Sequence, residues 1–327
     1  MSMKNVILNF AKQFSWEPVV ENAGRFERRG RYIVAGMGGS HLAGGILKSW
    51  KPTLPLVVHH DYGLPFPDGE LRWATVIASS YSGNTEEMLD IVGTAVRKNL
   101  SVVALSTGGR LLETARERGI PYLQIPSTGI QPRSALGFSV KALLAIAGDE
   151  DGLREASDCA HALDPQSSET TGRALAERLR GSVPIIYASQ RNESIAYNWK
   201  IKFNETGKIP AFWNVLPELN HNEMNGFDVK DATRELSHNF YFIFLRDPAD
   251  HPRILKRMEV VEQLYKDRGL RVEVMDLVGD TAFEKIFSSL VLADWAAYYT
   301  AEGYGLESEQ VPMIEEFKKL ITMDNDG

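Results

Sequence analysis

The first half of the chain alternates short apolar runs with amphipathic stretches of helical period. Short apolar runs bounded by turn residues are typical of buried strands, whereas apolar positions three or four residues apart predict a helix. The predicted strands are 31–36, 55–59, 74–79, 100–106 and 122–125, and the predicted helices are 41–50, 85–98 and 111–118. Strands that alternate with helices at this spacing predict a parallel sheet covered by helices on both faces.

The second half of the chain repeats this alternation of short apolar runs and amphipathic stretches. The predicted strands are 183–188, 240–245 and 270–277, and the predicted helices are 193–203, 252–268 and 282–301. Between the halves, the segment 149–171 is rich in Asp, Ser and Glu and contains a polar turn at 164–168. We therefore predict an α/β fold of two doubly wound parallel-sheet domains, residues 1–150 and 151–327. The similar rhythm of the two halves suggests an ancient duplication.

Composition and charge narrow the class of protein. A length of 327 residues is sufficient for two domains, and 43% hydrophobic with 24% charged residues is ordinary for a globular chain. The net charge of -7 argues against a nucleic-acid partner, which would require a basic face. No apolar stretch approaches the ~18 residues of a membrane span, and the N-terminal residues lack the features of a signal peptide. We expect a cytoplasmic protein with no membrane or nucleic-acid partner.

The cysteine and histidine content argues against a thiol or metal centre. Cys159 is the only cysteine, which excludes an intramolecular disulfide, and its helical surroundings favour a packing role. The seven histidines show no spacing typical of metal ligands. We therefore expect no metal site.

Two segments at predicted strand ends have the composition of ligand-binding loops. Segment 36–45 is rich in glycine, which lets a backbone approach a ligand closely and leaves helix amides exposed. The dinucleotide-binding motif would require glycine at position 41, where this chain has His41, so a nicotinamide site is disfavoured. Segment 79–85 places several hydroxyls at the carboxyl end of a strand and contains no lysine. These hydroxyls and the following helix end predict a phosphate site, and the alternative is an ordinary capped turn.

Three later residues supply candidate chemistry. Arg133 follows the fifth predicted strand, where a guanidinium could stabilise developing negative charge. Glu205 ends a predicted helix, and a partly desolvated carboxylate there would serve as a general base. His221 lies in a polar loop, and imidazole suits proton delivery near neutral pH. Each of them, taken alone, is also compatible with a solvated surface group. A phosphate site without metal or thiol favours proton transfer on a phosphorylated small molecule, and sugar-phosphate isomerisation fits best.

The segment 311–320 predicts an amphipathic C-terminal helix. Ile314, Phe317 and Leu320 repeat at helical spacing and would form its buried face. On composition alone, Lys318 would be a solvated charge.

Taken in this order, these segments resemble the bifunctional phosphoglucose/phosphomannose isomerase family, whose members contain two sugar isomerase (SIS) domains. The resemblance covers nearly the whole chain and implies that each half is a flavodoxin-like SIS sandwich. The segments that carry it are GMGGS at 36–40, SYSGNTEE at 80–87, QPRSALG at 131–137, NE at 204–205 and NHNE at 220–223.

The resemblance implies a substrate and the residues that bind it. Ser80, Ser82 and Thr85 would hold the sugar phosphate, and Gly39 and Ser40 would lie against the substrate. The implied reaction interconverts glucose 6-phosphate and fructose 6-phosphate through a cis-enediolate, with mannose 6-phosphate as a second aldose. No metal or organic cofactor is expected.

The resemblance also implies the catalytic groups. Glu205 would move a proton between C2 and C1, and Arg133 would stabilise the cis-enediolate. His221 would protonate the ring oxygen for ring opening, and in this family it reaches the site from the neighbouring subunit. A homodimer is therefore part of the implied mechanism. Lys318 matches the family's C-terminal active-site lysine, which also serves ring opening.

Two departures from the family pattern bear on these expectations. Family members usually read Asn-Glu-Asn-Ala-Lys at the base, whereas this chain has Thr206 and Gly207 in the middle, so the support of the base differs. Val311 aligns with a threonine of dual-specificity members, and a slip of one residue would place Gln310 there, as in glucose-specific relatives. Both alignments weaken the prediction of mannose 6-phosphate activity.

Two other functions fit the sequence at this point. One is that of an SIS isomerase of another phosphosugar, such as an amino sugar or a heptose. The other is that of a phosphosugar-sensing binding protein, which needs the phosphate loop but no base. The presence of both Glu205 and His221 favours an enzyme.

Overall fold

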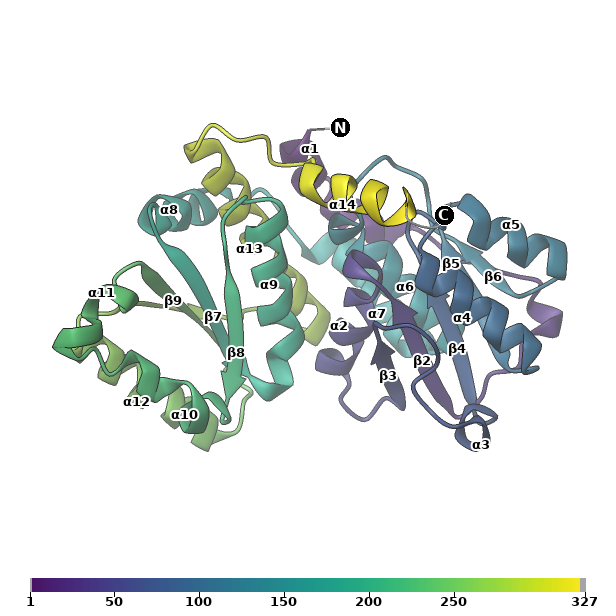
Figure 1. Ribbon diagram of the computed structural model, residues 1–327, viewed down its shortest axis with the longest axis horizontal. Helices are drawn as coiled ribbons and strands as arrows, with labels where there is room; N and C mark the ends of the chain where they lie inside the picture. Colours follow the sequence, from purple (N-terminus) through teal and green to yellow (C-terminus); the bar gives the residue numbers. More distant parts are fainter. Residues whose placement is uncertain (1, 324–327) are drawn as a thin grey trace.

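The computed structural model describes residues 2–323 and contains two β-sheets, each covered by helices on both faces (Figure 1). The strands of the first sheet are β1 (Val20–Glu21), β2 (Arg31–Gly36), β3 (Leu56–His59), β4 (Ala74–Ser79), β5 (Ser101–Ser106) and β6 (Tyr122–Gln124). Their order is β1-β6-β5-β4-β2-β3, and only β1 is antiparallel to its neighbour. The parallel strands therefore follow the flavodoxin-like order 2-1-3-4-5, which confirms the predicted fold class.

The second sheet repeats the order of the parallel strands with one such strand fewer. Its strands are β7 (Val183–Ser189), β8 (Phe212–Leu216), β9 (Phe240–Arg246) and β10 (Arg271–Asp276). They are all parallel and lie in the order β10-β9-β7-β8. The same order of parallel strands in both sheets agrees with the repeated alternation of strands and helices in the sequence. The exact domain boundary near residue 150 remains a prediction.

The helices of the first half cover both faces of the first sheet. They are α1 (Met3–Leu8), α2 (Leu42–Trp50), α3 (Asp68–Leu71), α4 (Glu86–Arg97), α5 (Gly109–Arg118), α6 (Leu136–Ala147) and α7 (Glu150–Ala162). Helices α3, α4 and α5 pack on one face, whereas α2 and α6 pack on the face turned toward the second half.

The helices of the second half are arranged in the same way. They are α8 (Glu169–Leu179), α9 (Glu193–Glu205), α10 (Leu219–Asn222), α11 (Arg234–Ser237), α12 (Pro252–Asp267), α13 (Ala282–Gly303) and α14 (Pro312–Met323). Helices α9 and α13 lie on the inner face of the second sheet, and α10 and α12 lie on its outer face.

A single apolar cluster joins the two halves. It includes Phe14 from the N-terminal segment, Ile46 of α2, Trp199 of α9 and Phe287 of α13, all of which are fully or almost fully buried. Burial of apolar surface of this kind is the main favourable term in folding. The cluster therefore fixes the face of the first sheet that carries α2 and α6 against the elements of the second half.

Several elements were not predicted from the sequence, among them α6, α8 and β8. Helix α6 is buried on nearly all sides, so its sequence lacks the polar stripe that reveals an amphipathic helix. Strand β8 is short and half-exposed, and the polar Asn214 interrupts its apolar run.

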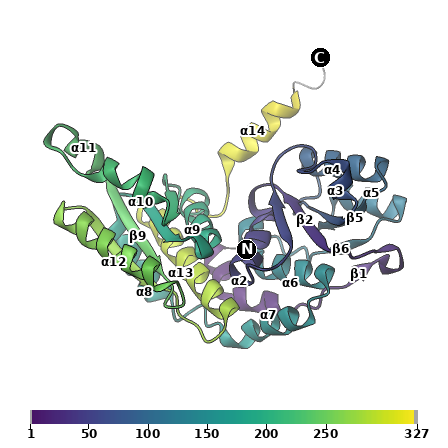
Figure 2. The same ribbon diagram turned by 90° about the horizontal axis from the view of Figure 1, so that it is seen from below.

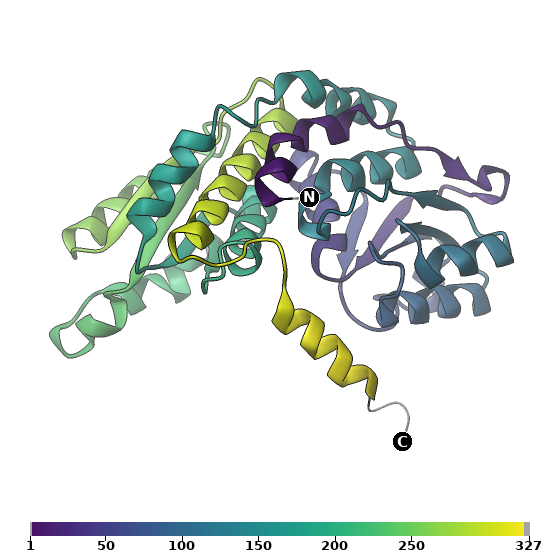
Figure 3. The ribbon, with the colours of Figure 1, turned by 90° about the horizontal axis from the view of Figure 1, so that it is seen from above.

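Helix α14 differs from the prediction in its surroundings. It forms as expected, but it projects away from both sheets (Figures 2 and 3). Ile314, Phe317 and Leu320 are 39%, 60% and 58% exposed, so the predicted buried face is not buried within this chain.

Cys159 is buried in α7, and burial raises the pKa of its thiol to about 12. A thiol with so high a pKa is a poor nucleophile at neutral pH.

In residues 2–323, no helix combines the length and apolar character needed to cross a membrane.

Candidate active site

Three loops meet at the carboxyl edge of the first sheet. They are the short helix η3 (Gly38–Ser40), the segment 79–85, and the short helix η4 (Pro132–Ser134). The Ser79 hydroxyl donates to the Ser40 carbonyl (2.9 Å), and the Tyr81 N–H donates to the Ser40 hydroxyl (2.9 Å). The first two loops follow β2 and β4, the neighbouring strands at which the strand order reverses. Ligands of open α/β sheets bind at this point.

Gly39 lies directly against the loop that carries Arg133. A Cβ atom at position 39 would lie 2.7 Å from the backbone nitrogen of Arg133 and 2.7 Å from Pro132. Only glycine permits so close an approach of two backbones. The predicted substrate-binding residues Gly39 and Ser40 therefore form one surface with Arg133.

Ser80 holds the segment 79–85, the hydroxyl-rich loop after β4, in its shape through hydrogen bonds within the loop. Its side chain is fully buried, and its hydroxyl accepts the N–H groups of Gly83 (3.0 Å) and Thr85 (3.4 Å). It is also 2.7 Å from the Thr85 hydroxyl. Ser82 is exposed, and Thr85 stands at the N-cap of α4. The groups at the mouth of the loop are thus Ser82, Thr85 and the first amides of α4, a combination suited to an anion.

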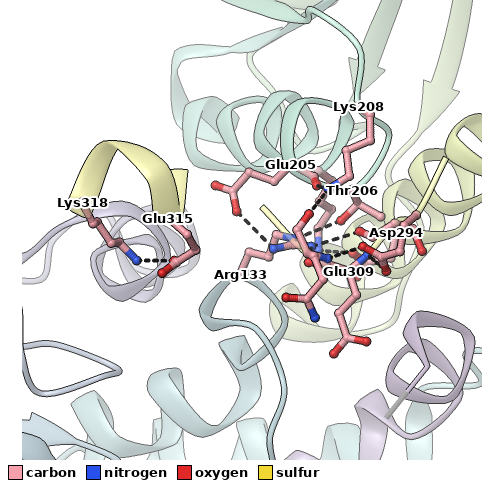
Figure 4. Close-up of polar contacts among 12 residues, drawn as sticks. Arg133, Glu205, Thr206, Lys208, Asp294, Glu309, Glu315 and Lys318 are labelled. Atoms are coloured by element: carbon pink, nitrogen blue, oxygen red, sulfur yellow. Dashed lines mark hydrogen bonds and ion pairs between the residues drawn. The ribbon is translucent and has the colours of Figure 1, made fainter. Parts of the chain in front are cut away.

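Arg133 is the central cation of the site, and its side chain is only 1% exposed. Its guanidinium donates to the Thr206 hydroxyl (2.9 Å), to the Glu205 carboxylate (3.3 Å) and to the carbonyls of Ser308 (3.2 Å) and Glu309 (2.7 Å) (Figure 4). Burial lowers the pKa of Arg133, and the nearby Glu205 carboxylate opposes that effect. These contacts fix the plane of the guanidinium.

Glu205 is the last residue of α9 and is partly exposed, at 25% of its side chain. The Lys208 ammonium donates to the Glu205 backbone carbonyl (2.6 Å) and to the Gln310 carbonyl. Glu205 thus has a fixed backbone, a carboxylate paired with the Arg133 guanidinium, and an open side toward solvent. These are the properties of a group that accepts a proton from a bound ligand.

A buried ion pair lies behind Arg133 and was not predicted from the sequence. Lys202 and Asp294 are 2.7 Å apart, and both side chains are almost completely buried. Burial raises the pKa of Asp294, whereas the Lys202 ammonium and the Arg133 guanidinium lower it. The only signal in the sequence is a single Asp within the apolar segment 282–301. Buried charges need such partners.

Thr206 marks one of the two departures from the family pattern, and the structure gives it a role. Its fully buried hydroxyl accepts the Arg133 Nε–H. We predict that Thr206→Val destabilises the protein by about 1–3 kcal/mol, because a buried donor loses its acceptor. Denaturant unfolding would measure this change in free energy. Thr206→Ser keeps the hydroxyl and is the matched control, so equal stability of the two variants would contradict this role.

His221 lies at the opposite end of the second sheet from Glu205. Helix α9 connects the parallel strands β7 and β8, so Glu205 is at the amino end of β8 and His221 follows its carboxyl end. Five residues of strand span about 17 Å. His221 is exposed on α10, on the outer face of the sheet. The structure therefore does not bring the predicted base and the predicted imidazole together within one chain.

The loop that carries His221 is fixed through Glu223. Its carboxylate accepts the Tyr187 hydroxyl of β7 and the Asn214 amide of β8. Burial raises the pKa of Tyr187, so this phenol remains a donor. The imidazole thus has a defined place on the surface of the second half.

Lys318 is on the projecting helix α14 and contacts Glu315 on the same helix (2.7 Å). Figure 4 shows this pair to one side of the Arg133–Glu205 pair. The Gln310 carbonyl, by contrast, shares the Lys208 ammonium with the backbone of Glu205. Lys208 therefore links the backbone of Gln310, one of the two positions predicted to affect mannose 6-phosphate activity, to that of the candidate base.

Within residues 2–323, no group of three or more His, Cys, Asp or Glu side chains is arranged to hold a metal ion.

The chain is similar in sequence to proteins of known family. A family model described as bacterial phospho-glucose isomerase C-terminal SIS domain matches residues 168–321. The chain is 31% identical over 325 residues to the bifunctional phosphoglucose/phosphomannose isomerase of Aquifex aeolicus, covering 97% of each chain. It is 34% identical over 309 residues to the protein of that name from Caldicellulosiruptor bescii, covering 89% of each.

Two further likenesses bear on chemistry and fold. The D-glucosamine-6-phosphate 4-epimerase of Sulfolobus acidocaldarius is 31% identical over 264 residues, which cover 78% of this chain and 82% of the relative. A hypothetical protein from Thermus thermophilus, of known structure, superposes with a TM-score of 0.71 at 18% identity, covering 99% of this chain and 88% of that one. The latter likeness concerns the fold alone.

Proposed function

The chain belongs to the bifunctional phosphoglucose/phosphomannose isomerase family, and from that premise we propose that it interconverts glucose 6-phosphate and fructose 6-phosphate. The observation that carries this proposal is the Arg133–Glu205 pair, 3.3 Å apart, next to the hydroxyl-rich loop after β4. An aldose–ketose isomerisation needs this combination of a base, a cation and a phosphate anchor.

The proposed mechanism assigns one step to each part of the site. The sugar phosphate binds at Ser82, Thr85 and the first amides of α4, and its binding energy positions C1 and C2. Glu205 removes the proton from C2 and returns it to C1. Arg133, whose guanidinium is already fixed by its other acceptors, stabilises the oxygens of the cis-enediolate. Ser80 contributes indirectly, because its buried hydroxyl fixes the shape of the phosphate loop.

We also propose a homodimer in which His221 of one chain serves ring opening in the other chain's site. The support is topological, because Glu205 and His221 lie at opposite ends of β8. A two-fold axis that brings one His221 to the partner's site necessarily does so in both directions. Lys318 is the second group proposed for ring opening.

We also propose a cytoplasmic location and a domain boundary near residue 150.

A side-by-side assay on metal-stripped protein tests the substrate. We expect turnover of glucose 6-phosphate without added metal and weaker turnover of mannose 6-phosphate, because Val311 has no hydroxyl where the family resemblance expects a threonine. Val311→Thr should raise mannose turnover relative to glucose turnover, and Val311→Ala controls for loss of volume. Equal use of both sugars by the unchanged protein would show that Val311 does not restrict the epimer.

A second candidate function is chemistry on an amino sugar phosphate. The similarity to a D-glucosamine-6-phosphate 4-epimerase favours an amino sugar over a heptose as the second substrate class. The same assay should include glucosamine 6-phosphate with product analysis. Conversion of that sugar without turnover of glucose 6-phosphate would favour this candidate.

A further inference from the structure

The segment 304–311 connects α13 to α14 and directs two of its backbone carbonyls toward the central cation of the candidate site. The Nη2 atom of Arg133 donates to the carbonyls of Ser308 (3.2 Å) and Glu309 (2.7 Å) (Figure 4). Ser308 is buried, so this contact is inside the molecule. The backbone of the segment is therefore part of the wall of the site.

The two carbonyls determine how the Arg133 guanidinium is oriented. An arginine side chain carries five N–H groups in one rigid plane. The Nε–H donates to Thr206, one Nη1–H donates to Glu205, and both Nη2–H groups donate to the segment. Within the described part of the chain, one Nη1–H is left for a bound ligand. Displacement of the two carbonyls would rotate the plane and misplace that N–H group.

Glu307 holds the same part of the segment from the opposite side. Its two carboxylate oxygens accept the N–H groups of Glu309 (2.7 Å) and Gln310 (2.6 Å). The Glu309 N–H and the Ser308 carbonyl belong to one peptide unit, and the Gln310 N–H and the Glu309 carbonyl belong to the next. Because the C=O and N–H of a trans peptide point in opposite directions, Glu307 and Arg133 bind opposite edges of the same two peptide units.

This arrangement gives an exposed carboxylate an influence on a buried guanidinium. Hydrogen bonds in a chain polarise one another, so the negative Glu307 strengthens the carbonyls as acceptors for Arg133. An exposed glutamate that caps a turn usually acts only locally, but here the capped peptides are those that Arg133 binds. Glu307 also acts on the neighbouring cation, because it opposes the lowering of the Lys208 pKa by burial and by Arg133.

We propose that Glu307 is a positioning residue for Arg133 and acts through the two peptide units between them. This inference rests on the proposed function, in which Arg133 stabilises the enediolate. Glu307 fixes the carbonyls, and the carbonyls fix the guanidinium before the substrate binds. The start of the segment is anchored separately, because the Gly181 N–H donates to the Tyr304 hydroxyl (2.8 Å). Loss of the Glu307 carboxylate therefore displaces the carbonyls without releasing the whole segment.

The isomerase assay of Glu307→Ala tests this role. We expect kcat for glucose 6-phosphate to fall by about 10–10²-fold with little change in KM, because Arg133 is misplaced and the phosphate loop is unchanged. Glu307→Gln keeps one acceptor oxygen and should lose less. Glu302→Ala removes an exposed carboxylate at the end of α13 and should leave both constants unchanged. A change in KM alone would contradict a positioning role.

A double-mutant cycle tests whether Glu307 acts through Arg133. Arg133→Lys replaces the planar fork of donors with a single ammonium, which cannot reproduce the paired contacts to the two carbonyls. In that background, Glu307→Ala should lower kcat by less than about twofold, because the group that it positions is already gone. Equal fold-losses in both backgrounds would mean that Glu307 acts independently of Arg133, and would overturn the proposal.

Failure of this inference is distinguishable from failure of the proposed function. The unchanged protein is assayed first, and absence of glucose 6-phosphate turnover would count against the proposed function. The same cycle is then measured by denaturant unfolding, which needs no substrate. Non-additive changes in the free energy of unfolding would support the connection between Glu307 and Arg133, and additive changes would overturn it.

Discussion

Replacing Glu205 with glutamine is expected to lower turnover of glucose 6-phosphate by about 10²–10⁴-fold, the usual contribution of a positioned general base. Glutamine has nearly the same shape and can still accept the Arg133 N–H through its amide oxygen, but it cannot take the C2 proton. The loss should appear in kcat with little change in KM, because the base acts only in the transition state. A coupled assay for fructose 6-phosphate measures both constants.

Two further measurements separate the loss of the base from general damage. Exchange of the C2 hydrogen with solvent, followed by NMR, should fall in parallel with turnover. Glu302→Gln changes an exposed carboxylate at the end of α13 and should leave both rates unchanged. Near-full turnover by folded Glu205→Gln would show that another group moves the proton.

Much of the fold is predictable because its signals are local. The alternation of apolar strands and amphipathic helices predicts parallel sheets, and glycine and hydroxyl residues mark the loops after β2 and β4. Helix α6 escapes this reasoning because a helix buried on nearly all sides has no period to detect.

The candidate site was only partly predictable because its contacts are long-range. Arg133 and Glu205 were each identified by motif, but only the packing of the two halves brings them within 3.3 Å. The supporting roles of Thr206 and of the Lys202–Asp294 pair depend on burial, which no short motif reveals. The surroundings of α14 could not be predicted either, because its apolar period indicates that a face is covered but not by which chain.

Mixing two inactive variants should restore activity if the sites are shared between chains. We expect Glu205→Gln and His221→Ala each to be severely impaired as homodimers, by about 10²–10⁴-fold. In the mixed dimer, one site combines an intact Glu205 with the partner's intact imidazole, and the other site lacks both groups. Random assembly of equal amounts makes about half of the dimers mixed, and each mixed dimer has one complete site of its two. The turnover of the mixture should therefore recover to about one quarter of the turnover of the unchanged protein.

A control mixture distinguishes shared sites from nonspecific stabilisation. Glu205 and Arg133 belong to the same chain's half of the site, 3.3 Å apart, so mixing Glu205→Gln with Arg133→Lys leaves every site with one defect. That mixture should show no more than the mean activity of the two variants. Native mass spectrometry, with one variant carrying a mass-shifting tag, confirms that mixed dimers form in both experiments. If dimers form and the Glu205→Gln and His221→Ala mixture still shows only the mean activity, the imidazole does not act in the partner's site. The separation of Glu205 and His221 along β8 would then mean that ring opening does not use His221 at all.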